Sequence, residues 1–161
     1  MSNIKLVVLD IDGIFTMGEA QTLDLTLLSR LAELNRRAKI DTQLPAVTLN
    51  TGRPSAYVEA IMQAIGGWQP ALYESGAGLY FPQSYQFQQT PLLTSDQMAT
   101  FKTILDAVDK EFVRTGRAYW QPGKTVCFSL FAHAPDTISS IVKDVKAYVA
   151  AISDEFIVNS A

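Results

Sequence analysis

The chain has 161 residues, of which 48% are hydrophobic and 18% are charged. This composition is ordinary for a globular protein and is sufficient for a domain of modest size with a hydrophobic core. The formal net charge is −3. It argues against a nucleic-acid partner, because non-specific binding to nucleic acid requires a basic surface.

The cysteine count and the hydropathy indicate the cellular setting. Cys127 is the only cysteine, so an intramolecular disulfide framework is excluded and a reducing compartment is favoured. No apolar run approaches the roughly 20 residues of a membrane span. The apolar run Leu6–Leu9 is too short for a signal peptide and is followed at once by acidic residues. We therefore expect a cytoplasmic protein without a membrane partner.

The first part of the chain alternates short apolar runs with amphipathic stretches. Residues 4–9 (IKLVVL) are typical of a central parallel strand that is covered on both faces. Asp24 is placed to cap a leucine-rich helix, a second strand is predicted over 46–49, and a second helix begins at Pro54. This order predicts βαβ units in an α/β fold. Right-handed crossovers then bring both strand-to-helix turns to one carboxyl edge of the sheet, where such folds bind ligands.

The sequence pattern changes along the second part of the chain. Residues 71–81 predict a strand that turns at Ser75-Gly76 into a hairpin, and the glutamine-rich residues 82–91 are interpreted as a crossing. We therefore predict two domains, a core over 1–82 and a smaller α+β cap over 83–161. The cap is predicted to contain two helices, two strands and the start of a third strand, over 96–114, 136–152, 118–121, 125–132 and 155–159 respectively.

The turn after the first strand carries two acids. Asp10 and Asp12 are two residues apart, and carboxylates this close repel each other unless a cation lies between them. Mg²⁺ prefers oxygen ligands and is often bound by one or two carboxylates together with a substrate phosphate. A carboxylate can also attack phosphorus, and a neighbouring carboxyl group can protonate the leaving oxygen. The pair predicts a nucleophile and a general acid/base beside a metal ion.

The turn after the second strand has the groups that a phosphate needs. Thr51 offers a hydroxyl, Gly52 allows close approach to a backbone amide, and Arg53 adds positive charge. The helix that follows has free N-terminal amides, which favour an anion. Thr51, Gly52 and Arg53 are therefore the candidate substrate-binding residues, although Arg53 could equally have a structural role.

These motifs resemble those of the haloacid-dehalogenase-like phosphatases. Residues 8–13 (VLDIDG) are similar to the first motif of that family, and residues 50–54 (NTGRP) are similar to its second motif in the form found in the Cof-type and sucrose-phosphatase-like subgroup. Residues 73–77 (YESGA) resemble a turn that commonly follows there. The resemblance implies a partial three-layer Rossmann-like core with an inserted cap.

The resemblance also implies roles for single residues. Asp10 would accept the phosphoryl group and Asp12 would be the general acid/base. The Asp10 carboxylate and the Asp12 main-chain carbonyl would bind Mg²⁺, while Thr51 and the Gly52 amide would hold the phosphate. The implied activity is Mg²⁺-dependent hydrolysis of a small phosphorylated metabolite, such as a sugar phosphate, through an aspartyl-phosphate.

Two further parts of the family pattern have no convincing match in this sequence. One is a lysine that neutralises the phosphate, and the other is a downstream acidic pair that completes the metal site. We therefore expect weak or no turnover of para-nitrophenyl phosphate by the isolated chain. The later core strands also have no counterpart, so residues 5–9 would form an open apolar edge that invites a homo-oligomer.

Other interpretations of the sequence remain open. A catalytically impaired or truncated protein with a binding or assembly role is the main alternative, and a phosphomutase is another. Trp120 and Lys124 flank a Pro-Gly turn and are candidates for substrate specificity. His133 is interpreted as a surface or cap residue and Cys127 as a core residue.

Overall fold

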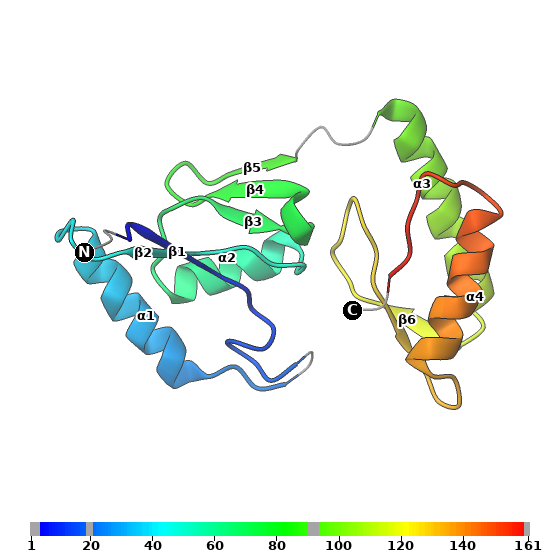
Figure 1. Cartoon of the computed structure of the whole chain (residues 1–161), viewed down its shortest axis with the longest axis horizontal. Coiled ribbons are helices and arrows are strands. Elements are labelled where there is room, and N and C mark those ends of the chain that lie inside the picture. The colour runs from blue at the N-terminus through cyan, green and yellow to red at the C-terminus, as the bar shows by residue number, and fades with distance from the viewer. Residues whose placement is uncertain (1–3, 19–20, 90–93, 160–161) are drawn as a thin grey trace. The chain divides into compact units, whose positions relative to one another are not determined.

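The computed structural model describes residues 4–18, 21–89 and 94–159. The chain divides into two compact units, Met1–Thr90 and Pro91–Ala161 (Figure 1). The predicted division after residue 82 falls before the strand β5, Gln86–Gln89, which pairs with β4, Gly78–Phe81, inside the first unit. None of the helices within these described ranges has the length and apolarity to cross a membrane.

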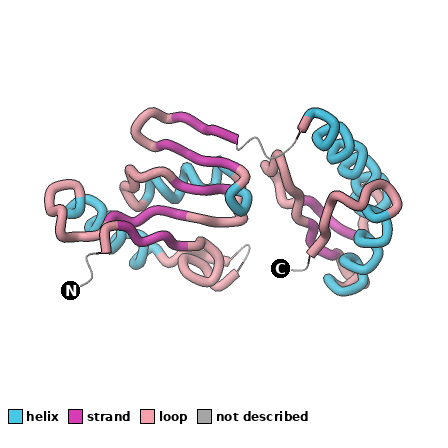
Figure 2. The backbone as a smooth tube through the Cα atoms, turned by 45° about the horizontal axis from the view of Figure 1, so that its top comes forward, coloured by secondary structure: helices cyan, strands magenta, loops and turns pink. Residues whose placement is uncertain are grey.

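The first unit has the predicted α/β character. The elements that precede β4 are β1 (Leu6–Leu9), α1 (Leu25–Ala38), β2 (Ala46–Leu49), α2 (Ser55–Ala64) and β3 (Ala71–Tyr73). β1 and β2 run parallel and in register from Leu6 opposite Ala46 to Leu9 opposite Leu49. β3, β4 and β5 form an antiparallel sheet (Figure 2), and a bridge from Asn50 to Leu72 links β2 to β3.

The ends of both helices follow from local sequence. One carboxylate oxygen of Asp24 accepts a hydrogen bond from the Leu27 amide at 2.9 Å, which confirms the predicted cap of α1. Pro54 is the N-cap of α2 and lies just before the first helical residue, Ser55. Because Pro54 offers no side-chain oxygen, the first amides of α2 have no side-chain cap.

Buried Asn35 ties α1 to both of its neighbours. Its side chain is fully buried, donates to the carbonyls of Val47 (3.2 Å) and Ile65 (2.9 Å), and accepts from the Val47 amide (2.8 Å). All the hydrogen-bonding groups of its amide are used, so the polar side chain costs little in this apolar core.

The first strand is covered on one face only. Val7 and Leu9 pack against the core, whereas Leu6 and Val8 alternate with them and are 45% and 48% exposed. Within the described ranges β1 pairs with β2 alone. The prediction of a strand covered on both faces is therefore wrong, and β1 forms the open apolar edge that the sequence led us to expect.

Two contacts shape the β3–β4–β5 sheet. Gly78 faces Tyr73 in the β3–β4 register, and a Cβ at Gly78 would lie 2.0 Å from the Tyr73 ring, so any larger residue would have to displace that ring. The glutamine-rich stretch was interpreted as a crossing but forms β5. Phe87 stacks on Tyr80 at a centroid distance of 4.6 Å, and this contact replaces the missing hydrophobic alternation.

The second unit packs two helices against a two-stranded antiparallel sheet. Its core contains Ile104, Val108 and Phe112 from one helical segment and Val145 and Val149 from the other. The α3 helix continues directly into a π-helical turn, and both α3 and α4 begin with a capping box. The elements are α3 (Ser95–Val108), the π-helical turn (Asp109–Val113), β6 (Ala118–Trp120), β7 (Leu130–Ala132) and α4 (Ile138–Ala150).

Two predicted strands of the second unit are corrected by the structure. The strand expected over 125–132 is only β7, because β6 offers three residues for pairing. Residues 155–159 form no strand. Phe156 instead stacks on Phe101 at a centroid distance of 5.8 Å, so the apolar residues of this tail reflect packing and not sheet pairing.

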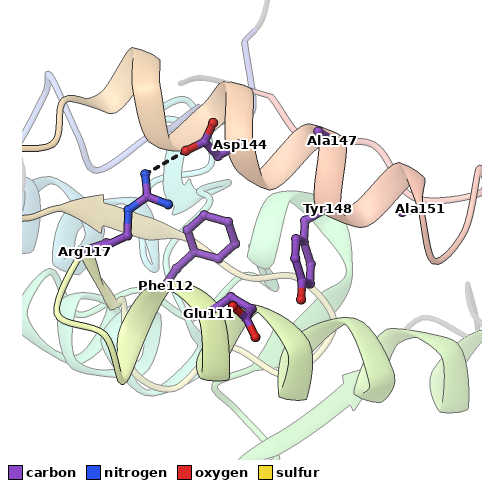
Figure 3. A pocket seen from close by; sticks show the side chains of 7 residues that line it. All are labelled: Glu111, Phe112, Arg117, Asp144, Ala147, Tyr148 and Ala151. Atoms are coloured by element: carbon purple, nitrogen blue, oxygen red, sulfur yellow. Dashed lines mark hydrogen bonds and ion pairs between the residues drawn. The ribbon is translucent and has the colours of Figure 1, made fainter.

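Arg117 joins the sheet of the second unit to α4. Its guanidinium donates to Asp136 at 3.0 and 3.1 Å and to Asp144 at 2.7 Å, and it lies 5.2 Å from the centre of the Phe112 ring. Arg117 helps to line a hollow of about 410 Å³, and Figure 3 shows its side chain pointing toward Asp144. The hollow is lined by Glu111, Phe112, Arg117, Asp144, Ala147, Tyr148 and Ala151.

We predict that the Asn35→Leu substitution lowers the free energy of unfolding of the first unit by about 2–4 kcal/mol. The buried amide and carbonyl of Val47 and the carbonyl of Ile65 would lose their partner. Urea unfolding monitored by circular dichroism measures the change. Ser29→Leu on the exposed side of α1 is the matched control and should change the value by less than about 0.5 kcal/mol. Equal stability of the two variants would contradict this role of Asn35.

The open β1 edge predicts self-association. Among the described strands only β2 pairs with β1, so the other edge of β1, beside exposed Leu6 and Val8, can pair with the same strand of a second copy. We expect light scattering to detect dimers or larger oligomers whose population rises with concentration, and Val8→Lys to reduce them. A clean monomer at high concentration, with no partner strand beside β1, would count decisively against this prediction.

The ion pair between Arg117 and Asp136 predicts that the stability of the second unit falls at acidic pH. The hydrogen bonds from Arg117, and after them the one from Ser140, lower the pKa of Asp136 below its ordinary value of 3.8. The stabilisation is therefore complete above that value and is lost as the pH falls through the lower folded pKa. A carboxyl ¹³C titration should give a midpoint below 3.8 that rises in Arg117→Met and stays unchanged in Lys146→Met. An unshifted midpoint in the unsubstituted protein would contradict the pairing.

Candidate active site

The acidic turn and the T-G-R turn meet at one end of the first unit. β1 and β2 end in register at Leu9 and Leu49, and the Asn50 amide donates to the Leu9 carbonyl at 2.9 Å. Arg53 then reaches Asp12 across 41 sequence positions with two hydrogen bonds. The parallel sheet therefore brings the two turns together at the edge where their strands end.

Two buried apolar side chains anchor the acidic turn. Ile11 and Phe15 are completely buried, and the Phe15 amide donates to the Ile11 carbonyl at 2.9 Å. Gly13 has a φ of +78°, which glycine adopts without strain, and its amide donates to the Thr16 carbonyl at 2.8 Å. Because Ile11 points into the core, its two acidic neighbours are directed away from it.

Asp10 is exposed and only partly engaged. One carboxylate oxygen accepts a hydrogen bond from the Ile11 amide at 2.6 Å. The other oxygen has no partner among the residues that the structure describes. Asp10 therefore presents an oxygen that is free to act as a nucleophile or a ligand.

The T-G-R turn holds its own backbone in place. The Thr51 amide donates to the Leu72 carbonyl at 3.3 Å, and the Thr51 hydroxyl oxygen accepts from the Arg53 amide at 3.3 Å. Thr51 is only 3% exposed. In the described part of the chain the Gly52 amide donates no hydrogen bond, so it is open to an anion.

A third turn supports the second one, and no role was predicted for its residues. The Glu74 amide donates to the Arg53 carbonyl at 3.0 Å, and the Ser75 amide donates to the Thr51 carbonyl at 2.9 Å. Glu74 and Ser75 have φ values of +47° and +57°, although neither is a glycine. Such backbone strain often occurs at functional sites. The resemblance of residues 73–77 to a family turn was the available signal.

The residues present fit a magnesium ion of the kind that keeps several water ligands. Asp10 has a free carboxylate oxygen, and the Asp12 carbonyl accepts no hydrogen bond from any residue in the described ranges. Both donors are oxygens, which Mg²⁺ prefers. The Asp12 carboxylate is already bound by Arg53. No group of three or more His, Cys, Asp and Glu side chains with metal-site geometry occurs within residues 4–18, 21–89 and 94–159.

The candidate residues of the second unit, Trp120, Lys124 and His133, each contact a neighbouring side chain. The Trp120 indole donates to Asp109 at 3.1 Å, and the Lys124 ammonium donates to the Ser129 hydroxyl at 2.6 Å. His133 is exposed, and its ring centre lies 4.8 Å from that of Tyr119. The predicted specificity roles of Trp120 and Lys124 stay predictions.

Comparisons with known proteins identify the fold. No protein-family model matches the sequence, and a search of curated proteins gave no significant match. Among solved structures, the C-terminal domain of trehalose-6-phosphate phosphatase from C. albicans is similar, with a TM-score of 0.65 and 16% identity. That alignment covers 95% of this chain and 53% of the other.

Two further solved structures share the architecture. The sucrose-phosphatase from Synechocystis has a TM-score of 0.52 and 17% identity over 94% of this chain and 57% of its own. A haloacid dehalogenase-like hydrolase from Bacteroides thetaiotaomicron has a TM-score of 0.51 and 17% identity over 71% and 39%. The chain thus spans about half the length of these proteins. Its fold is that of the haloacid dehalogenase-like hydrolases, as the motifs predicted.

Proposed function

We propose that this chain carries the phosphoryl-acceptor part of a magnesium-dependent phosphomonoester hydrolase. The observation that supports the proposal best is the junction of the two motif turns through Arg53 and Asp12. It places an exposed carboxylate, Asp10, and a free backbone amide, Gly52, on turns that end neighbouring strands. A phosphate held between a nucleophile and amide donors is the arrangement that phosphoryl transfer requires.

The proposed reaction has two steps. The Asp10 carboxylate attacks the phosphorus atom, the bond from phosphorus to the leaving oxygen breaks, and the protonated form of Asp12 gives its proton to that oxygen and becomes a carboxylate. Asp12 then takes a proton from water, the resulting hydroxide attacks the aspartyl-phosphate, and inorganic phosphate leaves with Asp10 restored. When bound, Mg²⁺ would supply positive charge that offsets the charge of the phosphate. Thr51 and Gly52 would hold the phosphate oxygens during both steps.

We infer that the substrate is a small phosphorylated metabolite, with sugar phosphates as the first candidates. The similar structures include proteins named for the phosphates of trehalose and sucrose. Their low identity carries no residue-level information about the substrate, so the class is proposed on fold and motif together.

A non-catalytic role in binding or assembly is the second candidate. The open β1 edge, with Leu6 and Val8 about half exposed, favours it, because such an edge commonly pairs with another chain. Stable oligomers that bind neither Mg²⁺ nor phosphate analogues would favour this function over hydrolysis.

We predict that the chain binds fluoroberyllate, a mimic of a phosphoryl group on aspartate, when Mg²⁺ is present. ¹⁹F NMR should detect a bound signal that disappears in Asp10→Asn and after removal of Mg²⁺ by EDTA. The control Asp106→Asn, which changes an exposed acid in α3, should keep the signal. A signal that survives in Asp10→Asn, or no signal in the unsubstituted chain, would contradict Asp10 as the acceptor.

Turnover is a separate readout in the same experiment. Release of inorganic phosphate from para-nitrophenyl phosphate is expected to be weak and to require Asp10. Robust release that is abolished by Asp10→Asn would mean that this chain supplies the lysine and the acidic pair from positions that the motifs did not reveal.

A further inference from the structure

We propose that Arg53 is a positioning residue that fixes the carboxylate of Asp12 for proton transfer. The proposal rests on the proposed function and deepens it. The Arg53 Nε atom donates to Asp12 Oδ2 at 2.8 Å, and Nη2 donates to Oδ1 at 2.6 Å. Both carboxylate oxygens are therefore held by one planar fork, which is the most directional ion pair that side chains form.

The guanidinium is itself held in place by the surrounding turns. The side chain of Arg53 is only 11% exposed, and its guanidinium carbon lies 5.0 Å from the centre of the Tyr57 ring. The Arg53 amide donates to Thr51, and its carbonyl accepts from Glu74. A group anchored at this many points can impose its orientation on a partner.

Asp12 is the more accessible partner of the pair. Its side chain is 35% exposed, three times the fraction of Arg53, so the carboxylate faces a region that a substrate can enter. An aspartate has two rotatable side-chain bonds, and without Arg53 the carboxylate could turn away from the leaving oxygen. Because the fork of Arg53 is directed at Asp12, the phosphate is left to Thr51 and Gly52.

This role predicts a dependence on the leaving group. An alkoxide, as in glucose 6-phosphate, needs a proton when the bond to phosphorus breaks, whereas para-nitrophenolate leaves without one. The ratio kcat/KM reports the steps up to departure of the leaving group and excludes hydrolysis of the aspartyl-phosphate. Loss of positioning should therefore lower kcat/KM for the alkyl phosphate selectively, even when absolute rates are small.

The test is a double-mutant cycle with Asp12→Asn and Arg53→Lys, assayed with Mg²⁺ on both substrates. Lysine keeps the charge but cannot form the fork. We expect Arg53→Lys to lower kcat/KM for glucose 6-phosphate by about 30-fold or more and for para-nitrophenyl phosphate by less than about 3-fold. In the Asp12→Asn background the second substitution should add less than about a 2-fold loss.

Three measurements keep the test decisive. The inhibition constant of inorganic phosphate should stay within about 3-fold in Arg53→Lys, which also shows that the site is folded. Tyr57→Leu, which removes only the ring under the guanidinium, should shift the two substrates in the same sense by a smaller factor. Arg30→Met, an exposed arginine in α1, is the control and should change neither substrate.

Different outcomes separate the two proposals. Losses that multiply in the double variant, or weaker inhibition by phosphate with equal losses on both substrates, would overturn positioning and make Arg53 a phosphate ligand. An unsubstituted chain that binds no fluoroberyllate in the presence of Mg²⁺, and releases no more phosphate than Asp10→Asn, would overturn the proposed function itself, and the positioning role with it, before any Arg53 variant is compared.

Discussion

The site depends on the parallel register of β1 and β2, which brings turns from distant parts of the chain to one sheet edge. Leu9 pairs with Leu49, and each strand gives way immediately to polar residues. A register slip of β1 by one residue would turn Val7 and Leu9 away from the core and turn Leu6 and Val8 toward it. The same alternation that buries Val7 and Leu9 therefore also fixes where Asp10 and Asn50 begin their turns.

The ion pair between Arg53 and Asp12 is compatible with burial only because its geometry is good. A nearly buried guanidinium loses most of its hydration, and this cost is offset only by a well-placed anion and further hydrogen bonds. The Arg53 guanidinium makes two hydrogen bonds to the Asp12 carboxylate, and its carbon atom lies 5.0 Å from the centre of the Tyr57 ring. The carboxylate that we propose as the acid/base group is therefore held by the same turn whose Gly52 amide donates no hydrogen bond within the described residues.

Most helices and strands of the first unit could be predicted because each is specified by a short segment of the sequence. The run of aliphatic residues, the Asp24 cap and the polar strand ends each specify a short segment, and the motif resemblance specifies their order. The direction of Arg53 could not be predicted, because a long flexible side chain takes its orientation from tertiary contacts. The hydrogen bond from the Glu74 amide to the Arg53 carbonyl was signalled only by the resemblance of residues 73–77 to a family turn, because a backbone contact leaves little trace in the residue types.

The failures of prediction also have physical causes. β5 has no hydrophobic alternation apart from Phe87, and its pairing depends on β4 and on the Tyr80 ring. The tail around Phe156 looked like a strand because apolar residues that pack by side chain have the same composition as a short strand. The exposure of Leu6 and Val8 depends on which elements flank β1, and no local pattern encodes that.

The most direct test of this account is an experimental structure of the chain with Mg²⁺ and orthovanadate. The account predicts one vanadate with its oxygens within hydrogen-bonding distance of the Gly52 amide and the Thr51 hydroxyl, and with the vanadium atom facing the free oxygen of Asp10. A vanadate bound elsewhere, or a structure in which the two turns lie too far apart to share one anion, would contradict it.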